Sequence, residues 1–534
     1  MNSTKCFIAL RSPAGNEKSG INYCSSPIVI PAEAGIHGSR PRRAWIPAFA
    51  GMTDPNPSVA RSKKYTRLRR VLTALATLVW LSGCMAGPDY QRPPVATPGV
   101  FRGSRATAPD PQSIADLKWF EVFQDEQLQE LIRTALVQNY DLRDAIARVD
   151  AARANLGITQ ADQYPTFGVG ADVTAIEASR RGEQTIPRGV GRERTFTTVF
   201  LNLFTFELDI WGRLRRATES ARGQLLASDW NRKTVITTLV SDVATAYFNL
   251  LELDMELAIA KDTLTTRQES LRLIKIQQQG GVATLLDVCQ GEQLVYSATE
   301  SIPNTERQIE QTENQISLLL GRNPEPVTRG RLLTEQQTPP EVPAGLPSSL
   351  LERRPDIQAA EQTLIAANAN IGVAKAAYFP QITLTGEFGF QSTALANLFS
   401  GSRRIWTFIP QLTYPIFDAG RIRSGVELAE AEQRSALAQY EKAIQTGFRD
   451  VSDALIQYQK VREVRAEREL LVTALQDRKR LAYLRYRGGV DTLLNALDAD
   501  RDLFNAELSL AQIRLSELLS LVQLYRALGG GWQE

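Results

Sequence analysis

Histidine is almost missing from this chain of 534 residues, in which His37 is the one copy. His37 precedes the signal sequence described below, so the mature part has no histidine. This absence excludes a histidine base, a Ser-His or Cys-His pair and a histidine metal ligand. Carboxylate chemistry stays open, but we find no Gly-x-Ser-x-Gly motif, no phosphate-binding loop and no paired carboxylates in a glycine-rich stretch. We therefore expect no enzyme activity, no cofactor and no metal site.

Cysteine is also scarce in the mature part, and the net charge of this part is negative. Of the four cysteines, Cys6 and Cys24 precede the signal, and Cys84 and Cys289 follow it. Because we expect Cys84 to be modified, no intramolecular disulfide remains. Residues 1–83 carry 12 Lys/Arg and 3 Asp/Glu, so removing this leader changes the formal charge from +2 to −7. The basic character belongs to the leader, and nothing predicts nucleic-acid binding.

A secretory signal is present before Cys84. A basic cluster is followed by the apolar run 71–80 and by Leu81-Ser82-Gly83-Cys84. This end resembles the lipobox of bacterial lipoproteins, so we expect Cys84 to be the first mature residue and to carry acyl chains. The alternative is a short anchor helix with an incidental cysteine, but the run is shorter than the roughly 20 apolar residues that span a bilayer. The basic residues are Lys63, Lys64, Arg67, Arg69 and Arg70.

The first 51 residues are unusual upstream of a signal. They contain two similar pieces, Ile30–Gly35 and Ile46–Gly51, and resemble a translated intergenic repeat. Our hypothesis is that translation starts at Met52 or later. The leader 1–83 then contains a lipoprotein signal peptide at 52–83.

The mature sequence is an internal duplication with halves of about 200 residues. Short matches recur at an offset of 215 residues up to Pro165 and of 208 residues from Gly212 onward. One difference of seven residues in a single connection explains both offsets. We divide the chain into 84–350, which holds an anchor, an equatorial segment and the first repeat, and 351–534, the second repeat. The matches are Asp141/Asp356, Gly157/Gly372, Pro165/Pro380, Gly212/Gly420, Gly280/Gly488 and Leu320/Leu528.

Each half contains two runs in which apolar and polar residues alternate, at about 165–176, 195–209, 381–391 and 405–417. Runs of about ten residues with this alternation are typical of membrane β-barrel strands. A hairpin packed on a soluble core fits the alternation equally well, although Pro410 argues against a central strand because it has no N–H to donate. The expected apolar face consists of Phe388, Phe390, Trp406 and Phe408, with Phe167, Val169, Val173, Phe200, Phe204 and Phe206 in the first half.

Two long helical patterns follow the strands, one after Gly212 and one from Gly420 to Arg487. Apolar residues recur every seven positions, as in a coiled coil, and about 65 residues make a rod of roughly 100 Å. The double glycines predict a tight reversal into a second helix. Pro303 is expected to kink the return helix of the first half. The recurring residues are Leu437, Ile444, Val451 and Tyr458, and Ile236, Val243 and Leu250.

Several motifs resemble the TolC-like outer-membrane factor family, in its lipoprotein branch that serves resistance-nodulation-division (RND) efflux pumps. Gly87–Pro93 follows the cysteine as in that branch, and Trp119–Asp125 resembles its next block. Glu207–Arg213 and Pro415–Arg421 resemble its strand-to-helix junctions, and Ala527–Trp532 resembles its terminus.

The resemblance implies a mainly α fold with a β-barrel contribution: a duplicated unit of long coiled-coil-like helices and two β-hairpins. Three subunits would form a twelve-stranded barrel and an α-helical periplasmic tunnel. It implies a passive outer-membrane channel that exports small toxic compounds. The implied partners are two further copies, a periplasmic adaptor (membrane fusion) protein, an inner-membrane RND transporter and outer-membrane lipid. Independently of the family, four strands cannot close a barrel, and open edges are not tolerated in lipid.

The resemblance also implies functional positions. Leu494, Asp498 and Arg501 match the periplasmic aperture of the lipoprotein branch, and their i, i+4, i+7 spacing places them on one helix face. The alternative is an ordinary surface pair of Asp498 and Arg501. The helix-turn tips are expected to contact the adaptor, or only to reverse the chain. These tips are Gly280, Gly281 and Val282, and Gly488, Gly489 and Val490.

Two other functions fit part of these observations. A channel for type I protein secretion would have the same architecture. A periplasmic coiled-coil lipoprotein scaffold without a pore would explain the heptads and the lipid anchor, but it has no use for aromatic-rich hairpins at matched positions in both halves.

Overall fold

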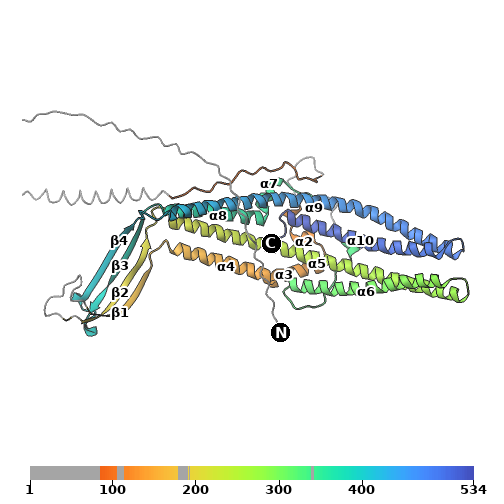
Figure 1. The fold of residues 1–534 in the computed structure, drawn as a ribbon, viewed down its shortest axis with the longest axis horizontal. Helices are drawn as coiled ribbons and strands as arrows, with labels where there is room; N and C mark the ends of the chain where they lie inside the picture. The colour runs from red at the N-terminus through yellow and green to blue at the C-terminus, as the bar shows by residue number, and fades with distance from the viewer. Residues whose placement is uncertain (1–84, 105–112, 178–190, 192, 338–341, 534) are drawn as a thin grey trace, which may run out of the picture. The chain divides into compact units, whose positions relative to one another are not determined.

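The computed structural model describes residues 85–104, 113–177, 191, 193–337 and 342–533. All of them belong to one compact unit, Ala74–Glu534. The leader 1–83 and Cys84 lie outside the described residues. Figure 1 shows four strands at one end of the long helices and two helix–helix turns at the other.

The duplication is visible in the order and the lengths of the elements. The first half runs α4 (Tyr140–Ala161), β1 (Phe167–Glu177), β2 (Glu193–Glu207), α5 (Arg213–Gln279) and α6 (Leu285–Leu319). The second runs α8 (Pro355–Ala376), β3 (Gln381–Ser392), β4 (Arg404–Thr413), α9 (Arg421–Arg487) and α10 (Leu493–Ala527). Both halves have helices of 22, 67 and 35 residues in the same order. α6 continues through Pro303 without ending.

The helices lie side by side in one layer. Toward the sheet the neighbours are α4, α5, α8 and α9, and toward the turns they are α6, α5, α10 and α9. α5 and α9 therefore run the full length of the layer. α4 and α6 lie along one side of α5, and α8 and α10 lie between α5 and α9.

Short elements cover one face of this layer near its middle. They are η1 (Ile114–Asp116), α2 (Trp119–Val122), α3 (Glu126–Gln138), η2 (Leu333–Glu335) and α7 (Pro347–Arg353). We call this group the belt. Its apolar side chains, such as Phe123, Leu128 and Ile132, form the main core with buried residues of α5, α6, α9 and α10. The predicted heptad residues Val243, Leu250, Val451 and Tyr458 are buried in this core.

A buried carboxylate attaches the belt to α5. Asp125 caps α3 by accepting hydrogen bonds from the N–H groups of Gln127 and Leu128. Its second oxygen accepts from the Tyr247 hydroxyl at 3.1 Å and the Arg331 N–H at 2.9 Å. Burial raises the pKa of Tyr247.

The four strands form one antiparallel sheet in the order β1-β2-β3-β4. The expected strands 165–176, 195–209 and 381–391 match it within two residues at each end. The fourth was wrong at its C-terminal end, because β4 ends at Thr413 rather than 417. Pro415 cannot donate to a ladder, and Asp418 instead accepts from the N–H groups of Gly420 and Ile422 to start α9.

One face of the sheet collects exposed apolar side chains. Cross-strand pairs place Val169, Leu201, Phe388 and Trp406 in one row, as predicted for all but Leu201. Asp172, Thr198 and Gln391 lie in a row on the opposite face. The expectation for Phe200 and Phe204 was wrong, because they lie on this second face.

Two features explain the wrong assignment. A bulge between Leu203 and Phe206 reverses the parity of β2, so that only Phe206 lies on the apolar face, opposite Leu384. The rings of Phe200 and Phe204 lie over glycines of β1, where a Cβ on Gly170 or Gly168 would come within 2.6 Å of the ring. Glycine thus makes room for aromatic rings on the polar face.

Within the described residues, one helix passes a length and hydropathy test for a membrane span, and it is α5. Of that stretch, 61% is buried, which is typical of a core helix.

Candidate functional site

The first candidate tip is the turn between α5 and α6. Gly280 ends α5, and Gly281 has a φ of +75°, a conformation that glycine adopts without strain. The Val282 N–H donates to the Gln277 carbonyl at 2.9 Å, while its side chain is 82% exposed. Thr284 caps α6 through a reciprocal pair of hydrogen bonds with Asp287.

The second candidate tip, between α9 and α10, repeats this geometry. Gly489 has a φ of +72°, and the Val490 N–H donates to the Arg485 carbonyl at 3.1 Å. The Val490 side chain is 67% exposed. Asp491 accepts from Asn495, the Thr492 N–H and Arg485, and these hydrogen bonds lower its pKa.

The two tips pack against each other. Ile274 and Val288 of the first hairpin form a buried cluster with Leu493 and Leu497 of the second. The Tyr486 hydroxyl donates to Gln277 Oε1 at 2.6 Å. The predicted tip residues of both halves are thus brought to one end of the molecule (Figure 1).

The three predicted gate residues lie on one exposed strip of α10. Leu494 is 50% exposed, and Arg501 Nη1 lies 3.2 Å from Asp498 Oδ1. Arg501 also contacts Asp502, which binds Arg478 of α9 at 2.6 Å. Within one subunit, Asp498 and Arg501 form a surface ion pair.

The matching positions of the first half differ in charge. They are Leu286, Gln290 and Gln293, obtained by the offset of 208. Leu286 is exposed on α6, as Leu494 is on α10. The leucine is thus common to both halves, whereas the charged pair belongs to the second half alone.

Sequence reasoning missed Asp500, which lies between the gate residues in sequence but on the opposite side of α10. Its side chain is 1% exposed and binds Arg267 of α5 at 2.7 Å and Lys479 of α9 at 2.6 Å. Arg267 also donates to the Leu294 carbonyl of α6. This charged contact therefore joins all four helices just inside the tips.

At the other end of α5, residues 85–89 form an N-terminal strap at the foot of the sheet. The Ala86 N–H donates to the Trp211 carbonyl at 2.9 Å, and Arg216, buried at the start of α5, binds Asp89 at 2.6 Å. Gly87 touches Gly372 so closely that a Cβ would lie 2.5 Å from the Gly372 Cα. Part of the predicted Gly87–Pro93 motif thus has a packing role.

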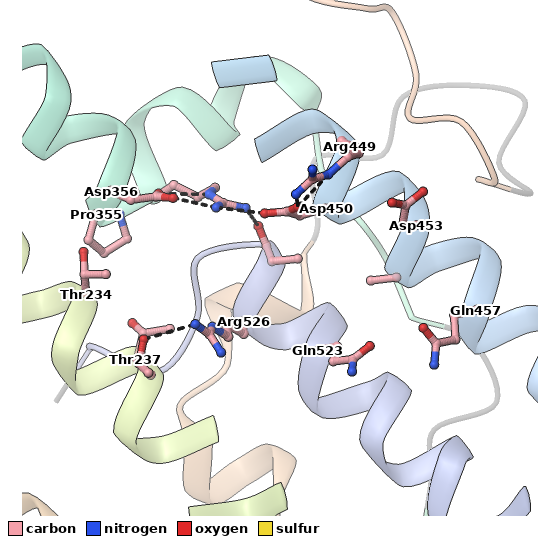
Figure 2. Close-up of a pocket in the computed structure, with 14 residues that line it drawn as sticks. Thr234, Thr237, Pro355, Asp356, Arg449, Asp450, Asp453, Gln457, Gln523 and Arg526 are labelled. Atoms are coloured by element: carbon pink, nitrogen blue, oxygen red, sulfur yellow. Dashed lines mark hydrogen bonds and ion pairs between the residues drawn. The ribbon is translucent and has the colours of Figure 1, made fainter. Parts of the chain in front are cut away.

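A polar cavity of about 480 Å³ opens on the helix face opposite the belt, where α8 begins and α10 ends (Figure 2). Arg354 links both helices, because it donates to the Ala527 carbonyl at 3.1 Å and to Asp356 and Asp450. Arg449 pairs with the same Asp450. Because these groups are paired with one another, we interpret the cavity as part of a charged contact between the stacked helices and not as a reactive site.

The chemistry available at these sites is that of surfaces and contacts. No cluster of three or more His, Cys, Asp or Glu residues suited to a metal occurs among the residues that the structure describes. Cys289 is a free thiol on α6. What the structure offers is an apolar sheet face, a polar helix face and a pair of exposed tips.

Comparison with known proteins agrees with this geometry. A family model described as "Outer membrane efflux protein" matches residues 131–322 and 346–530, one segment in each half.

The chain is 39% identical over 473 residues to a probable efflux pump outer membrane protein, TtgC, of Pseudomonas putida, covering 87% of this chain and 96% of that protein. It is 35% identical over 457 residues to the cation efflux system protein CusC of Escherichia coli, covering 85% and 97%. A crystal structure of the open state of the MtrE outer membrane channel of Neisseria gonorrhoeae superposes with a TM-score of 0.75 at 32% identity, covering 84% and 99%.

Proposed function

Since this chain belongs to the outer membrane efflux protein family, we propose that it forms the passive exit duct of a tripartite efflux pump. It is located in the outer membrane and acts in efflux, as its relatives are named for. The proposal rests on one observation. A sheet with one exposed apolar face is joined to helices that extend about 100 Å away from it. The family is named for efflux and not for catalysis, and we propose no enzyme activity for the chain.

We infer that three copies assemble. The outer edges of β1 and β4 are unpaired within one subunit, and unpaired backbone groups cost several kcal/mol each in lipid. Four strands are too few to close, whereas twelve form a barrel of known type. The outer helices α4 and α9 support this, because both expose apolar side chains along the layer edges. These are Tyr140, Ile146 and Ile158, and Leu428, Leu470 and Leu484.

In this assembly the row of Phe388 and Trp406 faces lipid, and the row of Asp172 and Gln391 faces water. The belt lies outside the helical tunnel, and the helix face opposite the belt lines it. Alternation of this kind between lipid and lumen is what a transmembrane barrel requires.

The N-terminal strap supports acylation at Cys84. Met85, the residue bonded to Cys84, packs against Gly212 at the strand-to-helix junction. Acyl chains on Cys84 would therefore start at the foot of the barrel, next to the inner leaflet. We expect Cys84→Ser to lose lipid labelling yet keep some function, because the barrel supplies most of the membrane attachment. Mass spectrometry that finds an unmodified Cys84 in the mature protein would rule out the anchor.

The partners that we propose are a periplasmic adaptor at the tips and an inner-membrane RND transporter that supplies energy. Gly280–Val282 and Gly488–Val490 expose backbone that another tip can approach closely. Leu494, Asp498 and Arg501 would form rings under threefold symmetry, with the leucines closing the pore by dewetting and the aspartates favouring cations.

Type I protein secretion is the second candidate, and a scaffold without a pore is the third. The purified oligomer should conduct ions in a planar bilayer, which a scaffold would not. In cells that lack their own exit duct, the chain with its adaptor and transporter should restore tolerance to small toxic compounds. Export of a protein substrate without such tolerance would favour the secretion role. Co-purification of all three components would confirm the assembly.

A further inference from the structure

Glu252 of α5 is a buried carboxyl group that the proposed channel role does not use. Its side chain is 6% exposed, and Oε1 has no hydrogen-bond partner. It lines a cavity of about 360 Å³ between α5 and α6. The other lining residues are Asn249, Leu253, Gln308, Gln311, Thr312 and Gln315.

The cavity opens on the face that we assign to the tunnel. Glu252 follows Val243 by nine positions, and at 100° per residue this places the two side chains on opposite sides of α5. Val243 is buried under the belt. Asp254, two residues further on, points back to the belt and binds Arg329 at 2.9 Å. Glu252 therefore points away from the belt.

A second carboxyl group lies one turn further along α5. Burial, followed by a hydrogen bond that the protonated carboxyl group donates to Glu256 and by repulsion from the charge of Glu256, raises the pKa of Glu252 to about 8. Gln512 of α10 donates to Glu256 Oε1 at 3.1 Å. At neutral pH Glu252 thus holds a proton.

The charged groups on the neighbouring elements bind one another. Arg329 contacts Glu313 of α6 as well as Asp254, on the belt side. Lys261 of α5 binds Glu306 of α6, and Arg465 of α9 binds Glu517 of α10. No lysine or arginine lines the cavity.

We propose that this cavity binds a small organic cation through its ammonium group, which replaces the proton held by Glu252. The proton leaves Glu252 for solvent, and the ammonium donates hydrogen bonds to the freed carboxylate and to amide oxygens of the Gln308, Gln311 and Gln315 rim. The volume suits a small molecule better than a bare metal ion, which needs several oxygens within about 2.6 Å. The inference rests on the proposed function in one respect only, which is that the channel would bring such cations to the cavity.

The test is calorimetric titration of the full-length oligomer in detergent with butylammonium, in two buffers that differ in ionisation enthalpy. We expect close to one proton released per cation bound at pH 7. Affinity should rise about tenfold per pH unit below pH 8 and level off above it. Glu252→Gln should weaken binding at least tenfold, whereas Glu306→Gln, which removes an exposed carboxylate of α6, should bind like the parent.

Glu256→Gln tests the pH dependence of binding, which would not change if Glu256 had only a structural role. Without the neighbouring carboxyl the pKa of Glu252 falls, so affinity should level off at a lower pH. Binding without proton release, an unchanged pH profile in Glu256→Gln, or full affinity in Glu252→Gln would overturn the proposal. So would binding of Mg²⁺ or Ca²⁺ at this cavity in place of butylammonium. Titration in detergent involves no transport, so the site and the channel role fail independently.

Discussion

Asp500 occupies a position where the packing of α10 would ordinarily place an apolar residue. Leu493, Leu497 and Phe504 share its side of the helix and are buried. In the sequence, Asp500 can be recognised as an acidic residue within a stripe of apolar residues along the helix. Its partners Arg267 and Lys479 lie 233 and 21 residues away, so the sequence does not identify them. Buried charges without partners are strongly unfavourable, and this explains why Asp500 is paired with Arg267 and Lys479.

Asp500→Asn should loosen the tips. The change leaves Arg267, 4% exposed, without its counter-charge, at a cost of about 3–5 kcal/mol. Hydrogen exchange of backbone amides around Arg267, Lys479 and Asp500 should become faster. Asp477→Asn removes an exposed pair with Arg480 and serves as the control, with little change expected. Equal protection in both variants would contradict a structural role for Asp500.

Glu252 should make stability depend on pH. Its pKa is about 8 in the folded chain against an ordinary value of 4.5, so between these values the folded state holds a proton that the unfolded state has lost. Stability therefore falls as pH rises from about 4.5 to 8 and changes no further above it, by on the order of 1 kcal/mol per pH unit. Glu252→Gln should flatten this slope in thermal unfolding, and Glu306→Gln should keep it. A parent protein with no slope would disprove the raised pKa.

At the scale of elements, the sequence predicted what depends on local periodicity. Heptads predicted α5 and α9, and the double glycines predicted both reversals. The faces of β2 were only partly predictable. Alternation identifies a face only while the register is unbroken, and the bulge after Leu203 depends on pairing with β3, which is 180 residues away in the chain. An equatorial segment was expected within 84–350, but the contacts of the belt were not predictable because they are long-range, as in the bond between Asp125 and Tyr247.

A positive charge introduced by mutation should distinguish the two faces of the sheet. Leu384 lies on the apolar face, paired with Phe206 and Pro410, and Thr385 lies on the other face, paired with Ile409. Leu384→Arg should cost roughly 2–4 kcal/mol if it meets hydrocarbon at the midplane, whereas Thr385→Arg should be mild. Assembly yield and resistance to thermal dissociation of the oligomer measure the difference. Similar losses in both variants would argue against a lipid-facing row.

The tips should bind the adaptor through exposed surface. Trp substitutions at Val282 and Val490 change side chains that are largely exposed, so folding should be unaffected. Crosslinking to the adaptor should fall several-fold, because bulk prevents close approach of the two tips. Ile276→Trp, at an exposed site on the side of α5, is the control. Adaptor crosslinking that survives both Val changes would exclude tip-to-tip contact.

At the scale of the whole molecule, the duplication would give the proposed trimer two kinds of tip in alternation. Three copies would carry six hairpins in a ring, three with Leu286, Gln290 and Gln293 and three with Leu494, Asp498 and Arg501. At these three positions, only the second kind has charged side chains. A closed state held by charged links at these positions would therefore depend on α10, which the ion pair between Asp500 and Arg267 attaches to α5.

This arrangement leads to a prediction about the opening of the proposed tunnel at its tip end. Asp498→Ala with Arg501→Ala removes the ion pair at 3.2 Å and any link that it forms to a neighbouring copy, and Leu494→Ser wets the apolar ring. Single-channel conductance in a planar bilayer should rise in the double variant and rise further in the triple variant. The corresponding changes Gln290→Ala and Gln293→Ala in the first half should have a smaller effect, because no charge is lost. If the triple variant conducts no better than the parent, the narrowest point lies elsewhere along the tunnel. Asp500→Asn then offers the next test, because it releases α10 from α5 without touching the exposed strip.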